Sequence, residues 1–336
     1  MASEGLIKRP LHFRKDFERI VALLELVFAE EIEARGMDIR AELITYKRLF
    51  PLFKILGLFS KTFRYTMNGF VFETKDEQII ASVNTSSLGN RWEIAMVATH
   101  PDYRRKGLAR DLVTDAINFV KDKRGNMCVL EVRSENTPAY HLYRDLGFIH
   151  YDSIAEMKLS PDNWPESIDL PIPDEYTITK IKRDNQTSMQ RYQLQVKETS
   201  EEVQQFLPVD KKRFKSSKLK NLLRPIMVRL LSMKLNSWLI YFKEELVGTI
   251  FVNFNKSGKN PHRVELVIDP DHQEKLAKSM LSIALTKISD RGFTNNNTLI
   301  TIRSSNSDLL AILKESGFEI VENNHKLGLK LKPTYF

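Results

Sequence analysis

Part of this chain occurs twice, at a constant separation of 170 residues. Val-Arg-Ser-Glu-Asn at residues 132–136 returns as Ile-Arg-Ser-Ser-Asn at residues 302–306, and Leu-Gly-Phe at residues 146–148 returns as Ser-Gly-Phe at residues 316–318. Two matches with one spacing indicate two copies of the same structural unit. A chain of 336 residues also exceeds the usual size of a single hydrophobic core, so two domains are expected.

Apolar periodicity predicts the same kind of strand and helix order in both copies. In the first half it predicts helices over residues 13–35, 107–124 and 138–146, and strands over residues 69–73, 78–85, 91–99, 127–133 and 153–159. From residue 174 the order restarts, with strands over residues 176–181, 238–243 and 247–254 and a helix over residues 188–206. Strands and helices mixed in this order predict an α/β fold built on a mixed sheet.

A proline-rich stretch separates the two copies. Residues 161–173 contain Pro161, Pro165, Pro171 and Pro173, which is typical of a linker. We therefore expect an N-terminal domain over residues 1–160 and a C-terminal domain over residues 174–336.

Composition narrows the class of protein. The chain is 42% hydrophobic, has no run of about 18 apolar residues and begins without the apolar core of a signal peptide, so we expect no membrane insertion and a cytoplasmic location. The single cysteine, Cys128, lies in an apolar run and is expected to be a buried, inert thiol. No group of histidines or cysteines has the spacing of metal ligands, so no metal is expected.

The net charge of +8 comes partly from two segments that contain basic residues and no acidic ones, residues 46–64 and 211–234. They could contact nucleic acid or an anionic membrane, but a solvated helix face gives the same pattern. Pro51 in the first segment is matched by Pro225 in the second, which favours a shared structural element over nucleic-acid binding. The second segment has apolar residues at helical spacing, namely Leu222, Leu223, Ile226, Leu230 and Met233.

In the first half, an apolar strand leads into a basic turn that opens a helix. The segment contains, in order, Val97, Ala98, Thr99, Arg104, Arg105, Lys106, Gly107, Leu108, Ala109 and Arg110. The first amides of a helix have no intrahelical partner, and the helix dipole adds partial positive charge there. Gly107 and the small Ala109 would let a pyrophosphate approach those amides closely. A surface helix with a solvated basic first turn gives the same bare pattern, so the segments around it decide.

This turn and two later segments resemble the GCN5-related N-acetyltransferase (GNAT) family. Arg104-x-x-Gly107-x-Ala109 is similar to the family's acetyl-CoA pattern, Gln/Arg-x-x-Gly-x-Gly/Ala, and residues 129–136 and 142–148 resemble its next strand and helix. The resemblance implies two tandem GNAT-like domains of the α+β mixed-sheet kind. It also implies acetyl-CoA as co-substrate and transfer of its acetyl group to a primary amine by direct attack in a ternary complex.

The same resemblance implies roles for individual residues. The pantetheine arm would lie along a bulged strand at Val97, Ala98 and Thr99, with the Val97 amide on the acetyl carbonyl. Asn136 resembles the family's cofactor-contacting asparagine, although a helix N-cap is its plain alternative.

Tyr143 matches the family's general acid, because it lies seven residues after Asn136 and four before Gly147. A phenol can protonate a departing thiolate. An aromatic side chain that packs on the sheet is the alternative reading, and Tyr140 is the fallback acid.

The general base is open between two carboxylates. Glu93 lies on the strand before the cofactor turn, and Glu131 lies in Leu-Glu-Val-Arg, each at a position where one branch of the family carries its base. A lone carboxylate on a strand buried on both sides is costly unless it is paired or functional. Glu131 could instead pair with Arg133 or another cation, and water could carry the proton without a single base.

The second copy differs where the chemistry would occur. Leu276 stands at the position of Gly107, Glu274 brings negative charge to the turn, and Leu313 stands at the position of Tyr143. A leucine side chain would obstruct a phosphate, so we interpret the second domain as degenerate. The chain is thus expected to be an acetyltransferase for a small-molecule or peptide amine. The alternative is a non-catalytic acyl-CoA-binding regulatory module.

Overall fold

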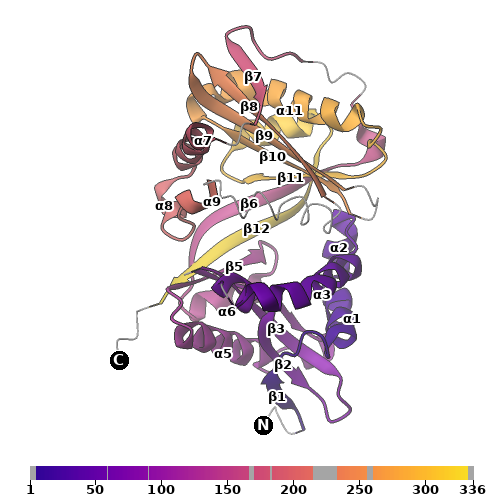
Figure 1. Cartoon of the computed structure of the whole chain (residues 1–336). Helices are drawn as coiled ribbons and strands as arrows, with labels where there is room; N and C mark the ends of the chain where they lie inside the picture. Colours follow the sequence, from indigo (N-terminus) through magenta and orange to yellow (C-terminus); the bar gives the residue numbers. More distant parts are fainter. Residues whose placement is uncertain are drawn as a thin grey trace. The chain divides into compact units, whose positions relative to one another are not determined.

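The computed structural model describes residues 5–58, 60–89, 91–165, 170–181, 184–214, 233–255 and 260–331. The chain forms two compact units (Figure 1). Unit 1 comprises Met1–Ala34, Asp38–Asp152 and Asn324–Phe336, and unit 2 comprises Arg35–Met37 and Ser153–Asn323.

Among the strands that the structure describes in unit 1, one pair of neighbours is parallel and the rest of the sheet is antiparallel. In spatial order the strands are β1 (Ile7–Pro10), β2 (Asn68–Glu73), β3 (Ile79–Leu88), β4 (Arg91–Thr99), β5 (Met127–Arg133) and residues 324–330 of β12 (Glu319–Lys330). β4 and β5 are parallel, and the other neighbours are antiparallel. The sequence-based expectation of an α/β fold with a mixed sheet is confirmed.

Side chains that alternate along the strands of unit 1 enter two separate cores. Phe72 and Ile80 belong to a core with α5 (Leu108–Asp122) and α6 (Thr137–Asp145). Val71 and Ile79 belong to a core with α1 (Phe17–Val27) and α3 (Ile39–Leu56). Because successive strand residues point to opposite faces, the two helix pairs cover opposite faces of the sheet.

The N-terminal region of unit 1 differs from expectation in two places. The helix expected over residues 13–35 is two helices, α1 and α2 (Ala29–Arg35), with Phe28 as the C-cap of α1. The first basic segment lies largely in α3, which contains Pro51 within the helix, and in α4 (Lys61–Arg64). The match of Pro51 with Pro225 favoured a structural element in this segment, but the buried side of that element, which consists of Leu43, Leu49 and Phe53 of α3, was not predicted.

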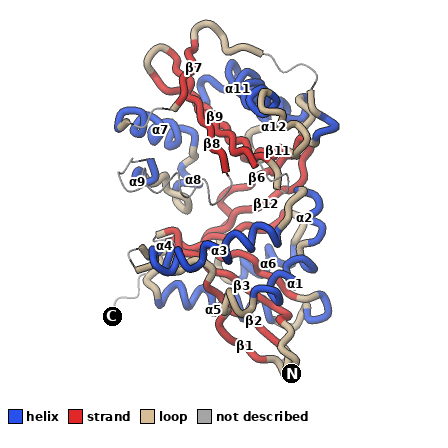
Figure 2. The backbone as a smooth tube through the Cα atoms, turned by 45° about the vertical axis from the view of Figure 1, so that its right-hand side comes forward, coloured by secondary structure: helices blue, strands red, loops and turns tan. Residues whose placement is uncertain are grey.

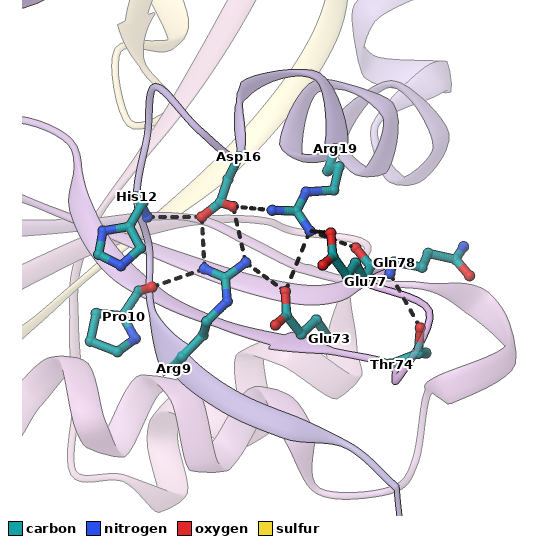
Figure 3. Close-up of polar contacts among 9 residues, drawn as sticks. All are labelled: Arg9, Pro10, His12, Asp16, Arg19, Glu73, Thr74, Glu77 and Gln78. Carbon is teal, nitrogen blue, oxygen red and sulfur yellow. Dashed lines mark hydrogen bonds and ion pairs between the residues drawn. The ribbon is translucent and has the colours of Figure 1, made fainter.

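An ion-pair network joins β1, α1 and the β2–β3 hairpin (Figure 3). The Arg9 guanidinium contacts the Asp16 carboxylate at 2.8 Å and the Glu73 carboxylate at 2.5 Å, and Arg19 contacts Asp16 at 2.6 Å. Burial by itself would raise the pKa of Asp16, but hydrogen bonds from Arg9 and the His12 amide, with the charges of Arg9 and Arg19, lower it. The network therefore fixes the N-terminal strand to the rest of unit 1.

Unit 2 repeats this plan. In spatial order its strands are residues 154–159 of β6 (Ile149–Leu159), β11 (Thr298–Arg303), β10 (His262–Ile268), β9 (Glu245–Asn255), β8 (Met233–Phe242) and β7 (Tyr176–Lys180). The long helix α11 (Gln273–Ser289) and α12 (Ser307–Glu315) share the main core of the unit, and α7 (Asn185–Glu198) packs on a smaller one (Figure 2). α8 (Glu201–Gln204) and α9 (Lys211–Phe214) follow α7 along the chain.

Each unit takes its last strand from the other copy of the repeat. Residues 324–330 of β12 pair antiparallel with β5 in unit 1, and residues 154–159 of β6 pair antiparallel with β11 in unit 2. Figure 1 shows the yellow β12 next to β5, although the two are far apart in sequence. The compact units therefore differ from the contiguous ranges 1–160 and 174–336 mainly by an exchange of equivalent strands, and unit 2 also includes Arg35–Met37 and the range 161–173.

Parts of the proline-rich stretch lie against α11. The Leu170 amide donates to the Ser282 hydroxyl at 2.9 Å, and the Ser279 hydroxyl donates to the Pro171 carbonyl at 2.9 Å. In the second basic segment, residues 215–232, and with them most of the expected apolar stripe, lie outside the described residues. Met233 was expected on that helical stripe, and this was wrong because it begins β8.

Two expectations from composition can be compared with the structure. Cys128 is buried, as expected, and burial raises the pKa of its thiol to about 12. Across the described ranges, none of the helices has the length and hydropathy needed to cross a bilayer.

Candidate functional site

The pairing between β4 and β5 ends early. Arg91, Trp92 and Glu93 pair with Met127, Cys128 and Val129, and the parallel ladder continues no further although β4 extends to Thr99. An unpaired strand edge offers backbone donors and acceptors to an extended ligand. The described backbone of β4 beyond Glu93 therefore has a free edge where it faces away from β3.

A β-bulge lies in the same part of β4. Its register against β3 shifts between Ser82 and Asn84, and Met96 has a positive φ of 51°. The Ser82 hydroxyl donates to the Met96 carbonyl at 3.2 Å, which helps to hold the bulge. The bulge places Val97, Ala98 and Thr99 after it, in the position that the sequence resemblance implied for a pantetheine arm. Bulges commonly re-aim strands next to functional sites.

The start of α5 is open. Gly107 is its N-cap with a φ of 80°, and no side chain caps the helix. A Cβ added to Gly107 would meet nothing within 4 Å, so the space in front of this residue is free of protein atoms. Leu108 is buried and anchors the first turn in the core. The fifteen-residue helix thus presents uncapped amides and the positive end of its dipole to this space.

Basic side chains surround this helix start. Arg105, Lys106 and Arg110 are exposed, and so is Arg104, whose Nε donates to the Thr99 carbonyl at 3.4 Å. Lys106 lies over the Tyr103 ring at 4.5 Å, and Arg110 pairs with Asp145 of α6 at 2.8 Å. Open amides with exposed cations fit a pyrophosphate.

Asn136 and Tyr143 are positioned by α6. Asn136 is the N-cap of this helix and accepts from the Ala139 amide at 3.2 Å, so its structural role is present. Tyr143 is 4% exposed and packs on Phe148 with the ring centroids 6.0 Å apart. Burial raises the pKa of the Tyr143 phenol, so it stays protonated at neutral pH. Tyr140, the fallback acid, has its hydroxyl 3.5 Å from His150 Nδ1.

Glu93 and Glu131 lie on the face of the sheet opposite Tyr143. Trp92 and Val132, their neighbours in sequence, enter the core that contains Tyr143, so the two carboxylates point the other way. The pKa of Glu93 is raised, first by desolvation and then by the negative charge of Glu131. The structure therefore has a protonated phenol on one face and a carboxylate of raised proton affinity on the other.

The expected burial was wrong for both carboxylates, because the side chains of Glu93 and Glu131 are exposed. The side chain of Glu131 is 48% exposed, and it pairs with Lys326 at 3.2 Å. Arg133, the neighbour considered as its partner, contacts Glu31 at 3.0 Å and Glu135 at 2.8 Å. Lys326 was missed by the sequence analysis because nothing local connects it to β5.

The corresponding turn of unit 2 is closed. The 3₁₀ turn η1 (Pro101–Tyr103) is followed by residues 104–107 before α5 begins, whereas α11 begins directly after η3 (Pro270–His272). Leu276, at the position of Gly107, is completely buried within α11. Its amide is therefore part of a helix rather than at the open start of one.

Comparison with known proteins shows what part of the chain is similar to. Residues 40–148 match the model of the acetyltransferase (GNAT) family. Streptothricin acetyltransferase of Streptomyces lavendulae is 35% identical over 68 residues, which cover 20% of this chain and 36% of that protein. N-alpha-acetyltransferase RimI of Mycobacterium tuberculosis is 29% identical over 85 residues, which cover 24% of this chain and 52% of that protein. The chain thus spans only about a third to a half of these two relatives.

A solved structure matches over almost the whole chain. A tandem GNAT protein from the clavulanic acid biosynthesis pathway has a TM-score of 0.58 at 13% identity, and the match covers 98% of this chain and all of that one. At this identity the match shows the fold and not the activity. Residues 40–148 are therefore similar to the acetyltransferase (GNAT) family, and the chain as a whole shares the fold of a tandem GNAT protein.

Proposed function

We propose that this chain is an acetyl-CoA-dependent N-acetyltransferase, in which unit 1 transfers an acetyl group to a primary amine by direct attack in a ternary complex. The observation that carries this proposal is the open, uncapped start of α5 at Gly107 next to the bulged strand β4. These two features offer a diphosphate site and a strand edge in adjacent segments of the chain.

The binding residues follow from this geometry. The amides from Gly107 to Arg110 and the exposed side chains of Arg104, Arg105 and Lys106 would hold the diphosphate. The backbone of Val97, Ala98 and Thr99 would hold the pantetheine arm, and Asn136 would contact it from the start of α6. When bound, acetyl-CoA supplies a thioester that an amine can attack.

Proton transfer uses groups on both faces of the sheet. Tyr143 is the proposed general acid, and its phenol donates a proton to the departing sulfur. Glu93 is the favoured base, since its pKa is raised towards neutral pH relative to that of an ordinary carboxyl group. Glu131 is paired with Lys326, which makes it the second candidate, and water is the third route. The Val97 amide would stabilise charge on the carbonyl oxygen.

Unit 2 is proposed to bind no acetyl-CoA, because Leu276 closes the turn that Gly107 leaves open. The acceptor is proposed to be a primary amine of a small molecule or a peptide. The two relatives described above are named a streptothricin acetyltransferase and an N-alpha-acetyltransferase. The acceptor screen should therefore include both small-molecule amines and peptides.

The proposal is tested by calorimetry and by thiol release from acetyl-CoA with a set of amines. We expect one acetyl-CoA per chain and turnover with at least one amine. Gly107→Leu copies Leu276 and should weaken acetyl-CoA binding by at least roughly tenfold, because the side chain fills the space before the amides. Gly292→Leu is the matched control, since Gly292 has a φ of 67° and also no atoms near a built Cβ.

Three results would contradict parts of the proposal. Two equivalent acetyl-CoA sites would contradict the assignment of a degenerate unit 2. Equal losses of affinity in the Gly107→Leu and Gly292→Leu variants would mean that backbone strain, and not the phosphate site, caused them. Tight acetyl-CoA binding without turnover on any amine would favour the non-catalytic acyl-CoA-binding module.

A further inference from the structure

Lys326 belongs to the second copy of the repeat but lies among the carboxylates of unit 1. It is directly opposite Glu131 in the β5–β12 pairing, and its ammonium nitrogen is 3.2 Å from Glu131 Oε1. Its side chain is only 18% exposed. Glu93, on the other neighbour of β5, is aligned with Val129 and so shares the face that carries Glu131. Three charged groups from three strands therefore share one face.

The equivalent position in unit 2 has the opposite charge. Glu156 of β6 corresponds to Lys326 in the repeat and lies opposite Thr301 of β11. It pairs with Arg263 at 2.9 Å, and Arg263 takes the place that Glu93 has in unit 1. Arg35 also pairs with Glu156. The charge is therefore inverted at two of the three positions, those of Glu93 and Lys326, while the uncharged Thr301 stands at the position of Glu131.

The exchange of strands decides which charge reaches the catalytic face. If each unit kept the strand of its own copy, Glu156 would lie opposite Glu131 and near Glu93. Three carboxylates would then repel one another, while Lys326 would lie near Arg263. The observed pairing places opposite charges together in both units.

We infer that the exchanged strand β12 supplies Lys326 as a positioning residue for the carboxylates of unit 1, where its ammonium group pairs with Glu131 and adds positive charge to the face that carries Glu93. This inference rests on the proposed function, because it concerns the base that deprotonates the acceptor amine. It gives the degenerate copy a part in the reaction of the other unit without any ligand of its own.

The direction of the effect follows from the groups around Glu93. Glu131 raises the pKa of Glu93, whereas Arg91 and Lys326 lower it, and Tyr46 of α3 faces the same carboxylate. Removing Lys326 therefore raises the pKa of Glu93. A base with a raised pKa is protonated over a wider range, so the acidic limb of kcat/KM moves to higher pH.

The test compares Lys326→Met, Lys326→Arg and Lys326→Glu in the full chain. Lys330→Met is the control, because Lys330 lies on the same strand and face but opposite Met127. Two measurements are made: the pH profile of kcat/KM, and the titration of the Glu93 carboxyl by ¹³C NMR in the protein without substrates. Lys326→Glu gives β12 the charge that β6 carries at Glu156, so it should shift both measurements most.

We expect the midpoint pH of the Glu93 titration to be lowest in the wild type, higher in Lys326→Met and highest in Lys326→Glu. At a pH on the acidic limb, kcat/KM of Lys326→Met should be roughly three- to tenfold lower than that of the wild type, with an unchanged KM for acetyl-CoA. Lys326→Arg and Lys330→Met should behave as wild type.

An active enzyme whose Glu93 titration and pH profile do not change in Lys326→Met would overturn the inference alone. A shifted titration in a protein without turnover on any amine would instead contradict the proposed function. If Lys326→Glu does not fold, Lys326→Met and Lys326→Arg still decide between these outcomes.

Discussion

Replacing Tyr143 by phenylalanine should separate catalysis from folding. The hydroxyl of Tyr143 has no hydrogen-bond partner among the described residues, while its ring is part of the core beneath α6. Tyr143→Phe keeps the ring and removes only the hydroxyl. No hydrogen bond within the described structure is lost, so the free energy of unfolding should stay the same or rise by up to about 1 kcal/mol.

The effect on turnover should be much larger. Loss of a general acid lowers the rate by roughly 10² to 10⁴, which corresponds to about 3–5 kcal/mol of transition-state stabilisation. Because the hydroxyl acts on the leaving sulfur, the fall should be in kcat, with little change in acetyl-CoA affinity. An enzyme that is as stable as wild type but loses most of its kcat would be the expected result.

Thiol release measures kcat, and urea unfolding followed by tryptophan fluorescence measures stability. Tyr140→Phe is the matched control on the same helix, since its hydroxyl lies 3.5 Å from His150 and has a different environment. Unchanged turnover in Tyr143→Phe with a loss in Tyr140→Phe would refute our assignment and make Tyr140 the acid. Unchanged turnover in both would move the proton donor to solvent.

Two further predictions concern carboxylates. Glu93→Gln should remove the acidic limb of the pH profile of kcat/KM. In the wild type the midpoint of this limb should lie above the usual pKa of a glutamate, because the pKa of Glu93 is raised. If Glu131→Gln removes the limb and Glu93→Gln does not, Glu131 is the base. Asp16→Asn should lower the free energy of unfolding by about 2 kcal/mol at neutral pH, because Arg9 and Arg19 lose a buried carboxylate while Arg9 keeps Glu73. The pKa of Asp16 is lowered in the folded state, so its contribution is complete above the unfolded-state value of about 3.9 and is lost as the pH falls through the folded-state value. Urea unfolding at several pH values between neutral and acidic checks this. The same difference in the free energy of unfolding between the wild type and Asp16→Asn at neutral and at acidic pH would contradict it.

Local patterns in the sequence predicted the parts of the site that a short segment forms by itself. The glycine before α5 is needed because the chain takes a positive φ there, and the apolar residues that follow specify the amphipathic helix. The N-cap role of Asn136 was likewise visible from its place before α6. The structural element that the match of Pro51 with Pro225 favoured is α3 in unit 1, but its buried face was not predicted, because basic residues and an internal proline dominate the segment.

The sequence by itself determined that the chain has two copies of one mixed α/β unit and that only the first copy keeps an open glycine turn, since these properties depend on residues close together in the chain. Only the tertiary structure decided that the last strands are exchanged and that Glu131 is exposed and paired with Lys326. The physical reason is that β6 and β12 are equivalent strands with the same backbone hydrogen bonds to offer. Their choice between β5 and β11 depends on charges and contacts that meet only after the chain has folded.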